Sequence, residues 1–437
     1  MTEQPVGDRA SRRSAFARML SSAVVNQALL SGTSLLVSLL LIRNTPDEEY
    51  GYYVLVLAAV LLLTQLQNSF FQPAMVERMT RFDLPQRQAL IGGLMTGLRR
   101  VWLRAAAVLL LIPALLGLTG VLSLELSLLT GLTIVVALAA LRREFTRTVL
   151  MSHRRVDAVF RADLVYAMFL IGGMLAAIYV PWPSLSATAS LGLAALVGGT
   201  LLRRLLWKHE SWDTPGTPGI LREIAPLALW STAGSVIHWS FSQGYAYLVA
   251  GTLDVAAVAA IGATRLTLMP VNLLSTGIGS LMLPLAARWL HDRGARFAFR
   301  RLLMFASGLA AAAISYFLVL WLLRDWVFGS ILNKRFEHRD TLLLMWGVGS
   351  VLAVMRDQLV FLPVARQRFR PLTALSASAA AVSLLTCYFG MVNYGVEGAL
   401  VGVLAGEAIN LTGLIVLSRR EIRNEEAAAA RAADGEA

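Results

Sequence analysis

Long apolar stretches separated by short polar loops dominate the chain. A helix needs about 20 mostly apolar residues to cross about 30 Å of hydrocarbon, so we expect each stretch to be a membrane-spanning helix. The pattern predicts twelve spans, at residues 19–42, 50–76, 88–118, 124–145, 160–181, 187–207, 223–250, 254–285, 299–324, 340–364, 372–393 and 396–418. The loops are too short to hold a soluble catalytic domain. We therefore predict an all-α integral membrane protein that is not an enzyme.

A segment rich in proline and glycine, residues 208–222, divides the spans into two sets of six and is expected to be a linker. The predicted parts are an N-terminal segment 1–18, a bundle 19–207, the linker, a second bundle 223–418 and a tail 419–437. A faint repeat relates the halves, because Thr45-Pro46-Asp47 and Thr252-Leu253-Asp254 occupy equivalent places. Transporters are often built from such repeats, with the substrate path between them. We expect two six-helix bundles around a central cavity, and a frayed tail without chemistry.

Basic residues are strongly asymmetric across the predicted loops. Of 39 Lys and Arg, 33 lie on the side of the N-terminus, five lie on the other side, and Arg265 lies within a span. Cytoplasmic loops of membrane proteins are enriched in Lys and Arg, so both termini are predicted to be cytoplasmic. The same asymmetry accounts for the net charge of +12 without a nucleic-acid partner. The polar first 18 residues and the long first span also argue against a cleaved signal peptide.

Composition narrows the function class further. Hydrophobic residues make up 57% and charged residues 15% of the chain, against about 45–50% and about 25% in soluble domains. This excludes a soluble enzyme and a disordered chain. The only cysteine, Cys387, excludes a disulfide framework, and no phosphate-binding loop or His-Glu-x-x-His motif occurs. We therefore predict no metal and no cofactor.

Ionisable residues inside spans are informative, because burying one in the bilayer costs at least about 2.5–3.5 kcal/mol. Arg265 lies about a third of the way along the eighth span. It is either a cavity cation that meets an anionic headgroup or half of a structural salt bridge. Glu407, near the middle of the twelfth span, either couples transport to an ion or pairs with an arginine.

Amides and one histidine form the other candidate set. Gln65, Asn68 and Gln72 are spaced to share one face of the second span, and Asn26 lies in the first. These amides either line a cavity for sugar hydroxyls or join helices. His238, midway along the seventh span, is either a substrate contact or a hydrogen-bonded structural histidine.

Other polar and small residues are expected to serve packing. Two local ion pairs are predicted at span ends, Arg161 with Asp163 and Arg356 with Asp357. Three glycines at spacing four form a ridge for close helix packing in the last span, Gly398, Gly402 and Gly406.

Four segments together resemble a known family. In chain order they are Arg43 to Tyr53 after the first span, Arg265 to Pro270 with Leu283-Pro284 in the eighth, Asp325 to Phe336 in an outer loop, and Asn393 to Ala399 before the last span. They resemble the junctions and signatures of bacterial polysaccharide-precursor flippases of the multidrug/oligosaccharidyl-lipid/polysaccharide exporter superfamily. The chain departs from the lipid II flippase branch, because its first span has no internal charge and no span follows the twelfth. Ser242-Gln243-Gly244 stands where many relatives carry an acid.

This resemblance implies two six-helix bundles and a transporter that flips polyprenyl-pyrophosphate-linked oligosaccharide across the bacterial plasma membrane. Arg265 would correspond to the family's basic residue in the eighth helix. The hypothesis assigns the pyrophosphate to Arg265 and the sugars to Asn26, Gln65, Asn68, Gln72 and His238. Membrane lipids, a polysaccharide polymerase and glycosyltransferases are the expected partners. The alternative is a drug/cation antiporter of the same superfamily, and a membrane-bound polymerase or ligase ranks third.

Overall fold

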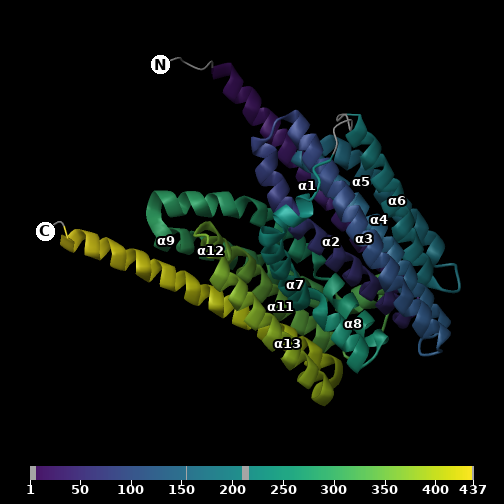
Figure 1. The fold of residues 1–437 in the computed structure, drawn as a ribbon. Coiled ribbons are helices and arrows are strands. Elements are labelled where there is room, and N and C mark those ends of the chain that lie inside the picture. The colour runs from purple at the N-terminus through teal and green to yellow at the C-terminus, as the bar shows by residue number, and fades with distance from the viewer. Residues whose placement is uncertain (1–5, 154, 209–215, 436–437) are drawn as a thin grey trace. The chain divides into compact units, whose positions relative to one another are not determined.

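The chain folds into helices (Figure 1). The computed structural model describes residues 6–153, 155–208 and 216–435. No β-strand occurs in these ranges. Nine of the described helices are long and apolar enough to cross a membrane, or ten when one sharply bent pair is taken as a span. The predicted all-α membrane architecture is confirmed.

The first six helices are α1 (Val6–Asn44), α2 (Asp47–Arg81), α3 (Leu84–Leu118), α4 (Leu124–Ser152), α5 (Val156–Ala177) and α6 (Pro183–Trp207).

The later helices are less regular than the predicted spans. They are α7 (Ile220–Thr252), α8 (Val255–Leu266), α9 (Met269–Leu322), α10 (Arg324–Trp326), the π-helix η1 (Val327–Leu332), α11 (Arg339–Leu359), α12 (Phe361–Ala365) and α13 (Phe369–Gly435). Gly294 interrupts α9 with a φ of 79°, and Gly395 interrupts α13 with a φ of 58°. These backbone conformations suit glycine, because a Cβ disfavours positive φ. Each glycine separates two of the predicted spans.

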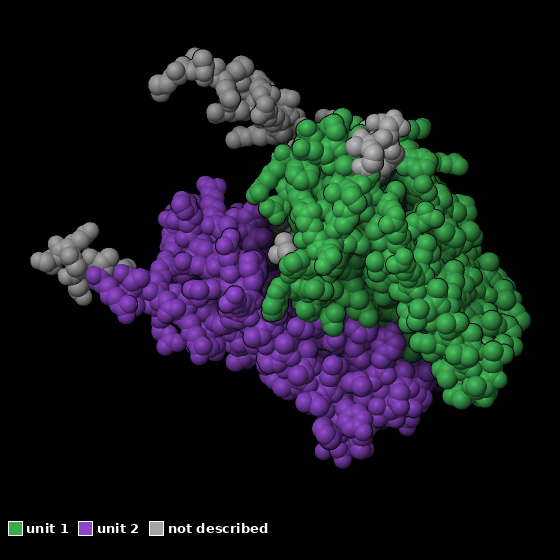
Figure 2. Space-filling view, in the orientation of Figure 1, with its two compact units in different colours: residues 1–236 green, residues 237–437 purple. Residues whose placement is uncertain are grey.

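The chain forms two compact units, residues 1–236 and 237–437, which Figure 2 shows in different colours. The boundary falls inside α7. Residues 209–215, the middle of the predicted linker, lie outside the described residues. The end of the linker packs on unit 1, because the Thr217 amide donates to the Ala89 carbonyl of α3 at 2.9 Å. A Cβ on Gly93 would lie 2.6 Å from the Thr217 carbonyl oxygen, so α3 needs a glycine there.

The core of unit 1 is a cluster of large apolar side chains from several helices. Phe71 of α2 and Leu94 of α3 are fully buried in it, together with Leu150 of α4 and Leu202 of α6. The rings of Phe71 and Phe145 lie 5.0 Å apart. Capping fixes where α3 begins, because Asp83 accepts a hydrogen bond from the Gln86 amide at 3.0 Å.

Close backbone packing joins the two segments of α13 in unit 2. A Cβ on Gly402 would lie 2.6 Å from both the Cys387 Cα and the Ser383 carbonyl oxygen. A Cβ on Gly406 would lie 2.6 Å from the Phe241 ring and from the Ser383 Cβ. The predicted glycine ridge therefore lies at a contact that admits no side chain.

The tail differs in part from the expectation, because α13 continues through it to Gly435 and makes specific contacts. Glu425 bonds Arg366 and accepts from the Ala295 amide, with its two oxygens at 3.1 and 3.3 Å. That amide directly follows the Gly294 break in α9. Further ion pairs join Glu421 to Arg368 at 2.8 Å and Glu426 to Arg296 at 3.3 Å. We call these three glutamates and their partners the tail clamp. The tail is helical, as expected, but its first turns are held by these contacts and are not frayed.

Candidate functional site

Arg265 lies at a break between two helices of unit 2. It belongs to the last turn of α8, and the chain then bends by 57° into α9. Pro270, at the start of α9, has no amide hydrogen, so it suits the first turn of a helix. The Tyr316 hydroxyl donates to the Thr267 carbonyl at the break, at 2.8 Å. Broken helices with satisfied backbone groups are typical of polar sites within membranes.

Arg265 is partly buried and is held by neutral groups of α7. Its Nη1 donates to the Tyr245 hydroxyl at 3.1 Å, the Ser242 carbonyl at 3.3 Å and the Gln243 side-chain oxygen at 3.4 Å. The guanidinium carbon also lies 5.4 Å from the centre of the Trp346 ring. Within the described ranges Arg265 forms no ion pair, so the salt-bridge alternative is not what the structure shows. Neutral groups thus orient the charge, and Glu407 lies within electrostatic range of it without forming an ion pair.

Glu407 is only 8% exposed and has an arginine partner. Both of its oxygens lie 2.6 Å from Arg356 Nη1. Arg356 Nη2 in turn lies 2.8 Å from Asp357, which confirms the predicted local pair and extends it into a triad. Of the two alternatives for Glu407, the structure therefore shows the arginine pair.

A charged cluster that the sequence analysis missed lies inside unit 1. Its centre is Asp163, whose side chain is fully buried. Asp163 accepts from Asn26 Nδ2 at 2.9 Å, Arg143 Nη2 at 2.5 Å and Arg147 Nε at 3.0 Å. Arg147 also pairs with Glu144 at 3.3 Å. Two arginines thus balance two carboxylates, as buried charges require.

The predicted pair of Arg161 with Asp163 is wrong. Arg161 is exposed, and its Nε donates to the Asp157 carbonyl at 3.4 Å. The prediction ended the fourth span at residue 145, but α4 continues to Ser152. Arg143 and Arg147 are therefore one turn apart on one helix face and not in a loop. Their spacing of four was the signal that could have revealed the cluster.

Two of the predicted amides are tied to this cluster. Asn26 bonds Asp163, and Asn68 Nδ2 lies 3.4 Å from Glu144 Oε1. The side-chain oxygens of Asn26, Gln65 and Asn68 are buried and accept no hydrogen bond from any described residue. Asn26 and Asn68 thus form interhelical contacts through their amide nitrogens, whereas their side-chain oxygens and that of Gln65 are enclosed by the surrounding helices.

The remaining two predicted residues differ in where they lie. Gln72 is exposed on α2, beyond Gln65 and Asn68. His238 of α7 lies within electrostatic range of Arg356 and Asp357 in unit 2, but among the described residues no hydrogen bond holds it. No group of three or more His, Cys, Asp or Glu side chains placed to hold a metal occurs in the described part of the chain.

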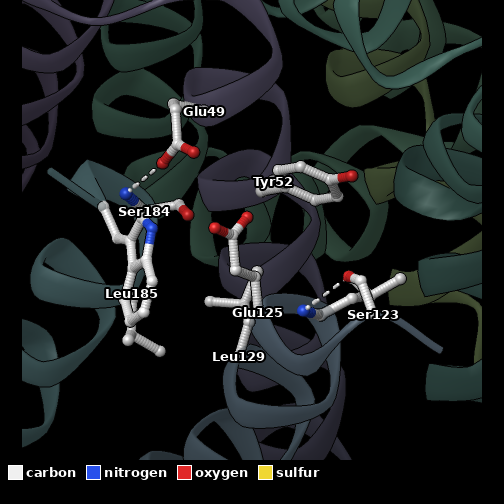
Figure 3. Close-up of a pocket in the computed structure, with 9 residues that line it drawn as sticks. Glu49, Tyr52, Ser123, Glu125, Leu129, Ser184 and Leu185 are labelled. Carbon is white, nitrogen blue, oxygen red and sulfur yellow. Dashed lines mark hydrogen bonds between the residues drawn. The ribbon is translucent and has the colours of Figure 1, made fainter. Parts of the chain in front are cut away.

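A small pocket in unit 1 is lined by two carboxylates, from Glu49 and Glu125 (Figure 3). Glu49 Oε2 accepts from the Ser184 amide at 2.6 Å, so this carboxylate caps the start of α6. The cavity volume is about 40 Å³, which is space for about three water molecules. This pocket is therefore structural and is too small for a sugar.

Comparisons with solved structures identify the fold. A lipid II flippase MurJ in an inward closed conformation matches with a TM-score of 0.74 and 12% identity, over 90% of this chain and 87% of that chain. An inward-facing multidrug resistance MATE family transporter of the MOP superfamily matches with a TM-score of 0.64 and 14% identity, over 90% and 94%. A mutant of the Vibrio cholerae MATE transporter VcmN matches with a TM-score of 0.62 and 14% identity, over 95% and 98%. No family model and no curated protein matches the chain.

Proposed function

We propose that this chain, whose fold is that of MurJ and MATE transporters, flips polyprenyl-pyrophosphate-linked oligosaccharide from the inner to the outer leaflet of the bacterial plasma membrane. The product would serve surface polysaccharide synthesis, either O-antigen or exopolysaccharide, and the mechanism would be alternating access. The observation that carries the proposal is Arg265, an oriented arginine without an ion-pair partner among the described residues.

The chemistry of the headgroup explains why such an arginine is useful. A pyrophosphate cannot enter hydrocarbon without compensation of its charge. Arginine presents a planar fork of donors that matches phosphate oxygens, and it stays protonated when desolvated. Gln243 and Tyr245 hold Arg265 through neutral oxygens, so an anion does not have to displace a carboxylate. A carboxylate in place of Gln243 would compete with the substrate.

The sugars require different groups, because their hydroxyls are neutral hydrogen-bond donors and acceptors. The side-chain oxygens of Asn26, Gln65 and Asn68 are acceptors of the kind that sugar hydroxyls bond. Because these oxygens are buried here, sugar binding would require the helices around them to open during alternating access. We include Gln72 and His238 in the proposed sugar-binding set on the sequence pattern alone. Glu407 has both oxygens bonded to Arg356, which supports a structural role over ion coupling. A polysaccharide polymerase and glycosyltransferases would be the partners that consume and supply the substrate.

Translocation of a labelled lipid-linked oligosaccharide in proteoliposomes tests the proposal. We expect Arg265→Ala to lower the rate about 10- to 100-fold, since a hydrogen bond to a charged group contributes about 1.5–3 kcal/mol. Gln243→Glu should also lower it, because the new carboxylate would neutralise Arg265. Arg300→Ala, an exposed arginine of α9, is the matched control and should leave the rate unchanged. Wild-type translocation by Arg265→Ala at a normal protein level would contradict the proposal.

A drug/cation antiporter is the second candidate function, because multidrug MATE transporters share this fold. Such a protein needs an anionic or aromatic pocket for its cations. Unit 2 does have an aromatic groove, but the described residues that line it include no carboxylate, and Arg265, a cation, forms no ion pair among the described residues. Efflux of ethidium by proteoliposomes under a proton or sodium gradient, combined with no flipping of the oligosaccharide, would favour this candidate.

A further inference from the structure

Unit 2 contains an open groove between α7 and the first segment of α13, with a volume of about 630 Å³. Its walls are aromatic. One side is formed by Trp239 and Tyr247 of α7, whose ring centres are 5.7 Å apart. The other side is formed by Tyr388 and Phe389 of α13, whose ring centres are 5.5 Å apart. This volume falls within the range of about 300–1,000 Å³ that is typical of ligand sites. The groove is therefore large enough for an organic ligand.

Gly244, which has no side chain, forms part of the floor of the groove. Ser240, Gly244 and Leu248 have a spacing of four, so they follow one face of α7. A Cβ on Gly244 would lie 3.4 Å from a Leu384 methyl group across the groove. A larger side chain at this position would therefore fill the floor.

The groove and Arg265 share one turn of α7. Gly244 faces the groove, while its neighbours Gln243 and Tyr245 bond Arg265. A helix with its side chains is about 10–12 Å across. Gln243 and Tyr245 each lie about 100° round the helix from Gly244, so α7 itself stands between the cation and the groove. A lipid that used both would place its anionic head on one side of α7 and its apolar chain on the other.

We propose that this groove binds the isoprenoid chain of the lipid-linked substrate, close to its pyrophosphate. The proposal rests on the proposed flippase function and adds a site for the part of the substrate that Arg265 and the amides leave unassigned. Among the described residues, those that line the groove carry no charge. An apolar chain therefore suits it better than an aromatic cation, for which a carboxylate would be expected.

Affinity measurements with two substrate analogues test the groove. Both carry the same pyrophosphate-linked sugar, but one has the full polyprenyl chain and the other a short one. We expect Gly244→Leu to weaken binding of the full-length analogue at least about tenfold, because excluding two methylene groups from an apolar site costs that much. Binding of the short analogue should be unchanged. Gly308→Leu is the matched control, because no atom lies within 4 Å of a Cβ at that helical glycine.

A photocrosslinker tests the groove independently, in case the Gly244 variant does not fold. Phe389 is 61% exposed, so p-benzoylphenylalanine at this position should be tolerated and should crosslink to the full-length analogue more than to phosphatidylethanolamine. Equal crosslinking to both lipids, or loss of crosslinking to the full-length analogue when ethidium is added, would overturn the groove proposal. Equal binding of both analogues by the wild-type protein would also overturn it and leave the flippase function standing. Failure of the wild-type protein to bind either analogue would instead contradict the flippase function.

Discussion

At the scale of single residues, buried charge is the dominant feature of unit 1. The Asp163 side chain has no exposed surface and accepts hydrogen bonds from two arginines and one amide. A carboxylate in this position holds Arg143 and Arg147, both from α4, and Asn26 from α1 in one arrangement. Because a buried charge without its partner is costly, the cluster should tolerate changes poorly.

We therefore expect Asp163→Asn to lower the free energy of unfolding by about 3–5 kcal/mol, as measured for removal of one partner from buried ion pairs. The thermal unfolding temperature in detergent should fall accordingly. Arg161→Ala is the matched control, since Arg161 is exposed and, among the described residues, bonds a single backbone carbonyl. Its change should stay within about 0.5 kcal/mol. Equal effects of the two substitutions would show that the cluster does not stabilise the fold.

At the scale of helices, glycines decide how closely the two segments of α13 approach. A Cβ on Gly402 would meet the backbone of Cys387 and Ser383, and backbone cannot rotate away as a side chain can. Gly308 of α9 lies in open space instead. Both glycines are helical, so replacement by alanine brings both the same gain in helix propensity.

Gly402→Ala should destabilise the protein by about 1–3 kcal/mol, because overpacking forces the helix segments apart. Gly308→Ala should be neutral or stabilise it by up to about 1 kcal/mol. Thermal unfolding of the two variants under one set of detergent conditions provides the comparison. A stabilising effect of Gly402→Ala would show that the close contact is absent.

The tail clamp also acts at the level of elements, because it links α13 to the Gly294 break and to the segment after α12. Glu425→Ala would leave the Ala295 amide and Arg366 without this acceptor, and should cost about 1–3 kcal/mol. Glu426→Ala removes only an exposed pair with Arg296 and should cost at most about 1 kcal/mol. The measurement is the unfolding temperature of each variant. A larger loss in Glu426→Ala than in Glu425→Ala would contradict the clamp.

At the scale of the whole molecule, the distribution of arginines predicts which ends of the helices are cytoplasmic. The natural cysteine, Cys387, is buried, so new cysteines can report accessibility. Ser330→Cys, on the predicted outer side, should react with a membrane-impermeant maleimide in intact cells. His291→Cys, on the predicted inner side, should react only after permeabilisation. Both positions are exposed, so the reverse pattern would mean that the orientation is inverted.

Patterns local to the chain predicted much of the architecture. The apolar stretches identified the helices, because bilayer insertion depends on the hydropathy of each segment alone. Arg265 stood out for the same reason, since a charge inside an apolar stretch needs a compensating environment. The spacing of Gly398, Gly402 and Gly406 indicated close packing, because a helical period places these residues on one face. Each of these features depends on residues within a few turns of one another.

Only the tertiary structure shows which polar side chains pair when they are far apart along the chain. Asn26 and Asp163 are 137 positions apart, and Arg356 and Glu407 are 51 positions apart. Nothing in either local pattern specifies the partner, because an arginine has the same sequence signature at a membrane surface and in a buried cluster. The glutamates of the tail likewise acquired a role only when folding brought α13 beside the Gly294 break. Local hydropathy thus determined the helices, whereas the pairing of charges required the helices to be packed together.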